Sequence, residues 1–312
     1  MKKPTIITNL SFALLFCFGV NSFGQGFSTQ KNAEGLEVKE GSQKVLFYQQ
    51  KPKSLDGKYE RAHYIHPLYG LNGEVLSEDF PEDHYHHRGV FWAWHQIVLN
   101  GTKVADAWEF DNIFWAVKKV KTKNTAQGLQ LSTRTFWQSV LAGQGPKWQS
   151  LFKEETVITI HPTEKDYRVI DFQIKMIPLK VGLALGGSED SKGYGGFSPR
   201  IKLPEDIQFM SPKGEVKAQT NGLEAGPWMD VLGTFDGVHP GGVAILTHPL
   251  YPSGEQLWIL RDKRSMQNAA YPGNQPIDLT KGKPLELRYR LVIHQQGMEA
   301  DFIEKLHQDF IK

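Results

Sequence analysis

The sequence predicts an all-β protein, a large antiparallel β-supersandwich with a short C-terminal helix. Apolar and polar residues alternate with period two along most of the chain after residue 24. Turn residues separate the alternating runs, and the composition (30 Gly, 17 Pro, 12% aromatic) is typical of β proteins with many turns. No repeat or low-complexity linker divides the chain. We therefore expect one domain over residues 25–312.

Two alternating segments define the predicted strands best. Residues 170–176 and 285–293 each place apolar side chains on every second position. Asn100-Gly101 predicts a hairpin between residues 92–99 and 103–108, because this pair favours a tight turn. We expect on the order of fifteen strands, too many for one small sandwich and suited to two large sheets.

One segment has helical instead of strand periodicity. From Met298 to Ile311, the residues Phe302, Leu306 and Phe310 recur on one face of a helix. We expect this helix to pack across a sheet as a C-terminal cap.

The first 24 residues resemble a secretory leader peptide. Lys2 and Lys3 precede an apolar run over residues 10–20, with cleavage expected after Gly24. That run is shorter than the roughly 20 residues of a membrane span, and no later segment approaches one. Cleavage would remove the only cysteine, Cys17, and lower the net charge from +2 to 0. We therefore expect a periplasmic or extracellular protein without disulfides, thiol nucleophile or nucleic-acid partner.

The densest group of chemically useful side chains lies between residues 61 and 95. It contains six of the eleven histidines. In an extended chain His84 and His86 would share one face, which Arg88, Trp92 and Trp94 would continue. The remaining histidines of the segment are His63, His66, His87 and His95, of which His87 and His95 would lie on the opposite face.

Three interpretations of this group remain open. His84, His86 and Asp83 could bind a divalent metal such as Zn, Mn or Fe. One imidazole could instead act as a metal-free general acid or base, with Arg88 holding a carboxylate, phosphate or oxyanion. The structural alternative is a polar loop pinned by Asp–His and Asp–Arg hydrogen bonds.

Further candidates lie outside the histidine-rich segment or at its end. Trp92 and Trp94 could stack on a sugar ring, although tryptophans also fill β cores. Tyr194 and Arg200 flank a glycine-rich stretch that could approach a ligand or form a bulge. His248 follows an apolar run and could face a cleft at a sheet end. No G-x-S-x-G motif, which would indicate a serine hydrolase, is present. Glu154 and Glu155 are expected to lie on a solvated strand face.

Several of these segments carry a family resemblance. The stretches YIHPLYG (64–70), DFP (79–81) and DHYHHRG (83–89), together with GYGGF (193–197) and GPWMD (226–230), resemble a bacterial family labelled methane oxygenase PmoA. That label implies a metal-dependent oxygenase, which needs two histidines and one carboxylate around open coordination positions. A membrane-bound oxygenase would contain several spans, and none is predicted here. The segment 279–293 is similar to the closing strand of galactose-mutarotase-like sandwiches, which implies carbohydrate chemistry at the level of fold.

The sequence thus predicts a secreted carbohydrate-active enzyme acting on a sugar, glycoside or oxidised sugar by hydrolysis, elimination or epimerisation. The partner would be a small-molecule or oligosaccharide substrate. The alternatives are a non-catalytic carbohydrate-binding or envelope protein, and the oxygenase. The expected centre, which should converge on one pocket, is His84, His86, His87 and Arg88, joined by His66 and Asp83, with Trp92, Trp94, Tyr194, Arg200 and His248 around it.

Overall fold

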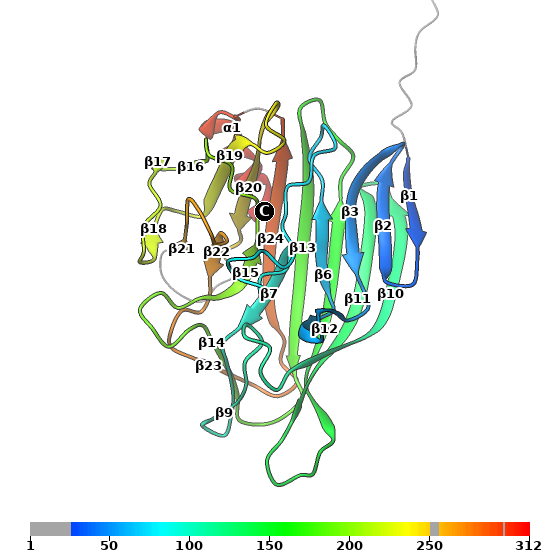
Figure 1. Cartoon of the computed structure of the whole chain (residues 1–312), viewed down its shortest axis with the longest axis vertical. Helices are drawn as coiled ribbons and strands as arrows, with labels where there is room; N and C mark the ends of the chain where they lie inside the picture. The colour runs from blue at the N-terminus through cyan, green and yellow to red at the C-terminus, as the bar shows by residue number, and fades with distance from the viewer. Residues whose placement is uncertain (1–25, 250–255, 296) are drawn as a thin grey trace, which may run out of the picture.

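The computed structural model of the chain describes residues 26–249, 256–295 and 297–312 (Figure 1). The expected leader, residues 1–24, lies outside the described residues. The described part is all-β, with two nine-stranded sheets, two small sheets and one helix, and every strand pairing is antiparallel. The predicted fold class is confirmed.

The strands of the first large sheet, sheet I, are, in spatial order, β1 (Phe27–Lys31), β2 (Gly35–Glu40), β3 (Gln43–Gln49), β6 (Tyr64–Leu68), β7 (Val90–Trp94), β15 (Gly195–Pro199), β22 (Asn268–Ala270), β21 (Leu257–Ile259) and β18 (Leu223–Glu224). Those of sheet II are β10 (Phe114–Thr125), β11 (Gly128–Val140), β12 (Trp148–Ile160), β13 (Tyr167–Pro178), β24 (Leu285–His294), β20 (Pro240–Thr247), β19 (Trp228–Thr234), β16 (Gln208–Ser211) and β17 (Gly214–Val216).

A four-stranded sheet contains β23 (Ile277–Leu279), β14 (Leu183–Gly186), β8 (Gln96–Leu99) and β9 (Thr102–Ala105), and a two-stranded one contains β4 (Lys53–Leu55) and β5 (Lys58–Arg61). The described part thus has 24 strands, more than the fifteen or so expected. Many of the additional strands have only two to five residues, too few to show an alternating pattern. The hairpin predicted from Asn100-Gly101 is present as β8–β9, with Leu99 paired to Thr102 and both turn residues at positive φ.

Aromatic side chains fill the space between the two large sheets. Trp92 of β7 lies 6.4 Å from the ring of Phe172 on β13, and Trp94 lies 5.9 Å from Trp137 on β11. Both tryptophans are almost completely buried. They therefore belong to the core and do not supply the exposed sugar platform expected of them, because their position on β7 turns them toward sheet II.

A buried polar cluster lies within this core. Glu154 on β12 accepts hydrogen bonds from the indoles of Trp92 (3.0 Å) and Trp137 (2.8 Å) and from the hydroxyl of Thr156. His63 Nε2 lies 2.5 Å from Glu154 Oε1. Glu154 is fully buried, so the solvated strand face expected for Glu154 and Glu155 is correct only for Glu155. Burial alone would raise the pKa of Glu154, but the charge and hydrogen bond of His63, with the other donors, lower it overall.

Helix α1 (Ala300–Ile311) lies near the top of the view in Figure 1. The helix begins at Ala300, two residues later than the predicted start at Met298. The residues it buries are Ile303, His307 and Phe310, whereas Phe302 and Leu306 are only partly buried. The buried face packs on a small apolar cluster of sheet II that includes Trp228, Leu246 and Val292. Within the described ranges, no helix has the length and apolar character needed to span a membrane.

Candidate functional site

One cavity gathers most of the histidines that the sequence singles out. Its volume is about 250 Å³. It is formed by the β6–β7 loop, the residues after β7 and after β9, the glycine-rich loop before β15 and the segment before β22. We call it the histidine cavity, and its lining residues are His84, His86, His87, His95, Trp108, Glu109, Ser188, Asp190, Tyr194, Ser265 and Met266.

The β6–β7 loop folds back in tight turns where an extended strand was expected. The amide of His84 donates to the carbonyl of Pro81 (3.0 Å), and the amide of His87 donates to that of His84 (2.9 Å). The rings of His84, His86 and His87 consequently lie 4.6–5.4 Å apart. The assignment of His87 to the opposite face is wrong, because strand parity applies only to an extended chain.

Arg88 lies beneath this loop and does not line the cavity. Its guanidinium is fully buried and donates to Asp79 (2.6 Å), to the carbonyl of Tyr59 (2.7 Å) and to the hydroxyl of Tyr64 (2.5 Å). It also stacks on the ring of Phe80, 3.6 Å from the centroid. Arg88 therefore pins the base of the loop, and the expectation that it joins the centre is wrong, because Arg88 pairs with Asp79 where the loop begins and ends, whereas the histidines lie in its turns.

Gly89 allows this loop to rejoin sheet I, and alanine there should be costly. Its φ is +57°, and a Cβ atom would lie 2.0 Å from the carbonyl oxygen of Ile65. We expect Gly89→Ala to lower the free energy of unfolding by about 1–2 kcal/mol for the left-handed backbone and by about 1–3 kcal/mol more for the clash.

The matched control for Gly89 is Gly101→Ala in the β8–β9 turn. Gly101 has φ of +77° but open space around its Cβ position, so it should show the backbone cost alone. Denaturant unfolding of both variants measures the difference. Equal losses of stability would contradict the close packing of Gly89 against Ile65.

Arg200, not Arg88, is the arginine that contacts the histidines. It is 2% exposed, and its guanidinium donates to Glu78 (2.7 Å), to Asp83 (2.8 and 3.1 Å) and to Nδ1 of His87 (3.1 Å). The sequence placed Arg200 among the outer residues. The structure places it directly behind the cavity, where it connects the β6–β7 loop to the end of β15.

Two carboxylates orient two imidazoles of the cavity. Asp83 lies 2.8 Å from Nδ1 of His84, and Asp106 lies 3.0 Å from Nδ1 of His95. Asp106 is itself held by Lys103 and by the backbone amides of residues 108 and 109. A carboxylate on Nδ1 fixes the proton there and leaves Nε2 as the basic nitrogen.

An aromatic wall borders the same cavity. The ring of Trp108 stacks on Tyr194 at 5.8 Å and on His95 at 5.3 Å, each with an interplanar angle of 21°. The hydroxyl of Tyr194 accepts a hydrogen bond from Arg261 (3.2 Å). Tyr194, which the sequence singled out, lines this cavity, and so do Trp108, Glu109 and His95, which were not among the site residues predicted from the sequence.

The sequence contained a pattern from which the unpredicted cavity residues could have been found. In the hairpin predicted at Asn100-Gly101, counting outward from Leu99 and Thr102 places His95 opposite Asp106. The backbone confirms the proximity, since the amide of Ala107 donates to the carbonyl of Trp94 (3.0 Å). Residues 95 and 106–109 thus reach the cavity from one hairpin.

The cavity shifts the pKa values of its acids and bases in opposite directions. Burial, together with the neighbouring His84, His95 and Arg200, lowers the pKa of His86 to about 4. Burial also raises the pKa of Glu109, whose Oε2 lies 3.6 Å from Nδ1 of His86. Such opposed shifts within one cavity are typical of acid–base sites.

These shifts predict acid sensitivity of the fold. The pKa values of His66 and His86 fall from the ordinary 6.5 to about 4, mainly through burial. Between about pH 6.5 and about pH 4 the unfolded chain therefore binds protons that the folded chain does not. We expect the free energy of unfolding to decrease as the pH falls through this window.

Thermal unfolding at a series of pH values measures this effect. Each of the variants His66→Asn and His86→Asn should reduce the slope of the free energy of unfolding against pH by the contribution of about one proton. A profile that keeps its full slope in both variants would contradict the lowered pKa values.

Two more predicted residues lie away from the cavity. His66 does not line it, and its Nδ1 pairs with the hydroxyl of Ser77 (2.9 Å) near Arg88. His248 lies instead in a second cavity of about 500 Å³ between α1 and the edge of sheet I. Its Nε2 accepts a hydrogen bond from Arg288 (3.0 Å). The expectation that His66 converges on the histidine cavity is wrong, because His66 lies on β6, whereas His84, His86 and His87 lie in the loop after it. The far wall was expected from residues 194–200 or from His248, and Tyr194 lines the cavity while His248 lies away from it.

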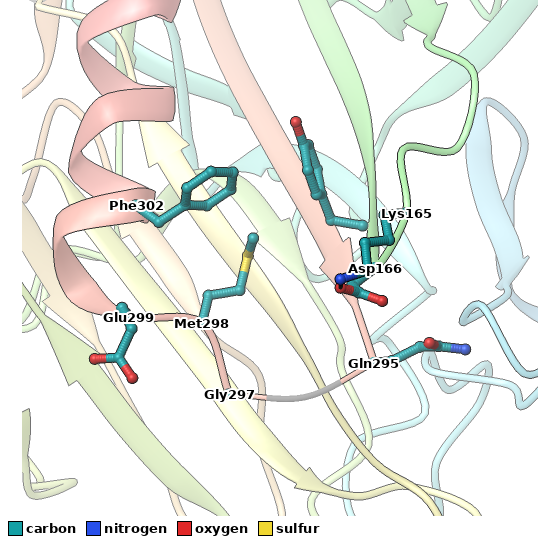
Figure 2. Close-up of a pocket in the computed structure, with 8 residues that line it drawn as sticks. Lys165, Asp166, Gln295, Gly297, Met298, Glu299 and Phe302 are labelled. Carbon is teal, nitrogen blue, oxygen red and sulfur yellow. Dashed lines mark ion pairs between the residues drawn. The ribbon is translucent and has the colours of Figure 1, made fainter.

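A larger cavity of about 610 Å³ lies at the start of helix α1 (Figure 2). Figure 2 shows Met298 and Phe302 on the helical side and Lys165, Asp166 and Gln295 across from them. Among the residues that the structure describes, no histidine lines it. We take the smaller histidine cavity as the candidate site, because chemistry depends on convergent functional groups more than on volume.

The side chains predicted to bind a metal are arranged differently from a ligand set. Over the described ranges, no three His, Cys, Asp or Glu side chains are grouped so as to hold a metal ion. Asp83 instead receives two hydrogen bonds from Arg200 and pairs with His84. As arranged, His84, His86 and Asp83 do not form a ligand set.

Comparison with known proteins places the chain in one family. No protein of curated function matches it. A family model matches residues 35–308, which is most of the chain and contains the whole histidine cavity. The protein therefore belongs to this family, which is described as a family of unknown function, DUF6807.

Proposed function

We propose that the protein is a carbohydrate-active enzyme that transfers protons to and from a sugar, glycoside or oxidised sugar in the histidine cavity. The observation that carries the proposal is the convergence of two carboxylate-held imidazoles with an aromatic wall. The imidazoles are His84 and His95, and the wall is Trp108 with Tyr194. Aromatic faces suit the apolar C–H face of a sugar ring, and the imidazoles supply acid–base groups.

The proposed roles follow from the proton positions. Asp83 leaves Nε2 of His84 as a proton acceptor, and Asp106 does the same for His95. Burial raises the pKa of Glu109 above its ordinary value, which favours the protonated form that can donate a proton. A base and an acid on one cavity serve hydrolysis, elimination and epimerisation alike, because each of these reactions moves a proton to or from the sugar.

The alternative of a binding module has less support. A carbohydrate-binding face normally presents several exposed aromatic rings, and of the aromatic residues in the described part only Tyr85 (38%) and Trp148 (46%) are extensively exposed. The oxygenase implied by the PmoA-labelled family would need the ligand set discussed above, and the donors do not fit it. Chelation remains a direct test of that alternative.

A substrate screen tests the proposal. Purified protein is incubated with neutral glycosides, keto-sugars and uronides, and the products are followed by NMR. We expect turnover of one class, its loss in the double variant His84→Ala/His95→Ala and its persistence in His239→Asn, whose histidine lies exposed on the β19–β20 turn. Lack of turnover of all classes, or full activity of the double variant, would refute the proposal. Loss of turnover on treatment with a chelator would favour the metal-dependent alternative.

We also propose that the chain is exported. The support is the leader pattern of residues 1–24, with its positive start and short apolar run. We expect N-terminal sequencing of protein recovered outside the cytoplasm to begin at Gln25. Recovered protein that still carries Met1 would contradict cleavage.

A further inference from the structure

Arg200 constrains the protonation of His87. A guanidinium donates hydrogen bonds and cannot accept them. Because Nη1 of Arg200 lies 3.1 Å from Nδ1 of His87, that nitrogen must be the acceptor and carry no proton. A neutral His87 therefore carries its proton on Nε2.

The surroundings keep this imidazole neutral. His87 is 2% exposed, its ring stacks on His84 at 4.7 Å, and His86 lies edge-on at 4.6 Å. Burial, His86, Arg200 and His84 together lower the pKa of His87 well below its ordinary value. Protonating Nδ1 would also remove the hydrogen bond from Arg200 and place two cations in contact.

The remaining nitrogen is available to a ligand. Nε2 of His87 makes no hydrogen bond to any described residue, and the ring lines the histidine cavity. Its neighbour His84 has the opposite arrangement, since Asp83 holds the proton on Nδ1 and leaves Nε2 as an acceptor. The two stacked rings are nearly parallel, with an interplanar angle of 5°.

We propose that His87 is a permanent neutral hydrogen-bond donor to an oxygen of the bound substrate, and that Arg200 is the positioning residue that fixes it in this state. His84 and His87 then divide the work: His84 accepts the proton, and His87 donates a hydrogen bond to the oxygen on which negative charge develops. This role in catalysis rests on the proposed function, whereas the proton position of His87 does not.

The proton position is measured on the free protein. In ¹⁵N-histidine-labelled wild type, the ring signals of His87 are assigned by their loss in His87→Gln. We expect a protonated Nε2 and an unprotonated Nδ1 at pH 7, and the same form when the pH falls below the ordinary histidine pKa of 6.5, because burial keeps the ring neutral. In Arg200→Met, which removes the donor, we expect the Nδ1-protonated form to appear. A proton on Nδ1 in the wild type, or the same Nε2-protonated form in Arg200→Met, would overturn the assignment.

The catalytic part is measured with the substrate found in the screen. His87→Leu should lower kcat by about 10²–10³, the usual effect of removing one donor to a developing oxyanion. His87→Gln should retain most of this activity, because its amide can donate from a similar position. Equal activity of the leucine and glutamine variants would overturn the donor role while leaving the proposed function intact. Absence of any substrate would refute the proposed function and the catalytic role together, but not the NMR result.

Discussion

Glu154→Ala is expected to lower the free energy of unfolding by about 3–5 kcal/mol, the usual result of removing one partner of a buried, hydrogen-bonded carboxylate. Glu154 is fully buried between the sheets, where its carboxylate receives two indole hydrogen bonds and contacts His63. Alanine would leave all these donors without a partner and also create a cavity. Glu154→Gln should cost less, because it keeps the volume and part of the hydrogen bonding.

Glu155→Ala is the matched control, one residue further along β12. Its side chain is 36% exposed and pairs with Arg134 (3.1 Å) and Lys153 (3.4 Å) at the surface. Surface pairs of this kind contribute about 0–1 kcal/mol. Urea unfolding of both variants gives the comparison, and similar small losses would show that the Glu154 cluster does not stabilise the core.

The fold was predictable because it depends on a pattern spread over the whole chain. Strands such as β13 and β24 alternate buried and exposed residues as their sequences do. Helix α1 was also predicted, but its most buried side chains are Ile303, His307 and Phe310, whereas Phe302 and Leu306 are only partly buried against sheet II. Which of two adjacent helical faces is buried depends on the partner surface, which the helix sequence does not contain.

The site was only partly predictable, because its geometry depends on turns and on distant segments. The clustering of His84, His86 and His87 followed from their density in the sequence, but their common orientation follows from the turns at Pro81 and His84. For the same reason Arg200, and not Arg88 as predicted, contacts the histidines. Arg88 is adjacent to the histidines in sequence, whereas Arg200 reaches them through the spatial proximity of β15 and the β6–β7 loop.

The tryptophans illustrate a different limit. Trp92 and Trp94 stand next to the histidine-rich loop, yet the alternation of β7 turns both toward sheet II. Phe91, one position earlier, lies instead near Trp108 and His87 on the outer face. Adjacency in sequence therefore suggested the wrong set of alternate residues on β7. Which set faces the core could not be derived without knowing where the partner sheet lies.

His84→Ala is expected to lower turnover by about 10²–10⁴, the usual loss on removing a general acid or base. Asp83 holds Nδ1 of this imidazole at 2.8 Å, so the variant removes Nε2, the proton acceptor of the proposed reaction. Stability should change little, because the His84 side chain is 39% exposed and its truncation buries no unpaired group. Asp83→Asn should lower turnover as well, since an amide in place of the carboxylate no longer stabilises the Nδ1-protonated ring.

Paired measurements of turnover and melting temperature separate a catalytic role of His84 from a structural one. His239→Asn is the control, because His239 is also an exposed histidine paired with an aspartate, Asp236, at 2.7 Å. If His84 is the base, its variant loses turnover at an unchanged melting temperature, while the control keeps both. If His84 only pins the loop through Asp83 and Arg200, its removal loosens that network and lowers the melting temperature. Full turnover at a reduced melting temperature would therefore assign His84 to the structure of the loop and leave His95, held by Asp106, as the remaining base of the cavity.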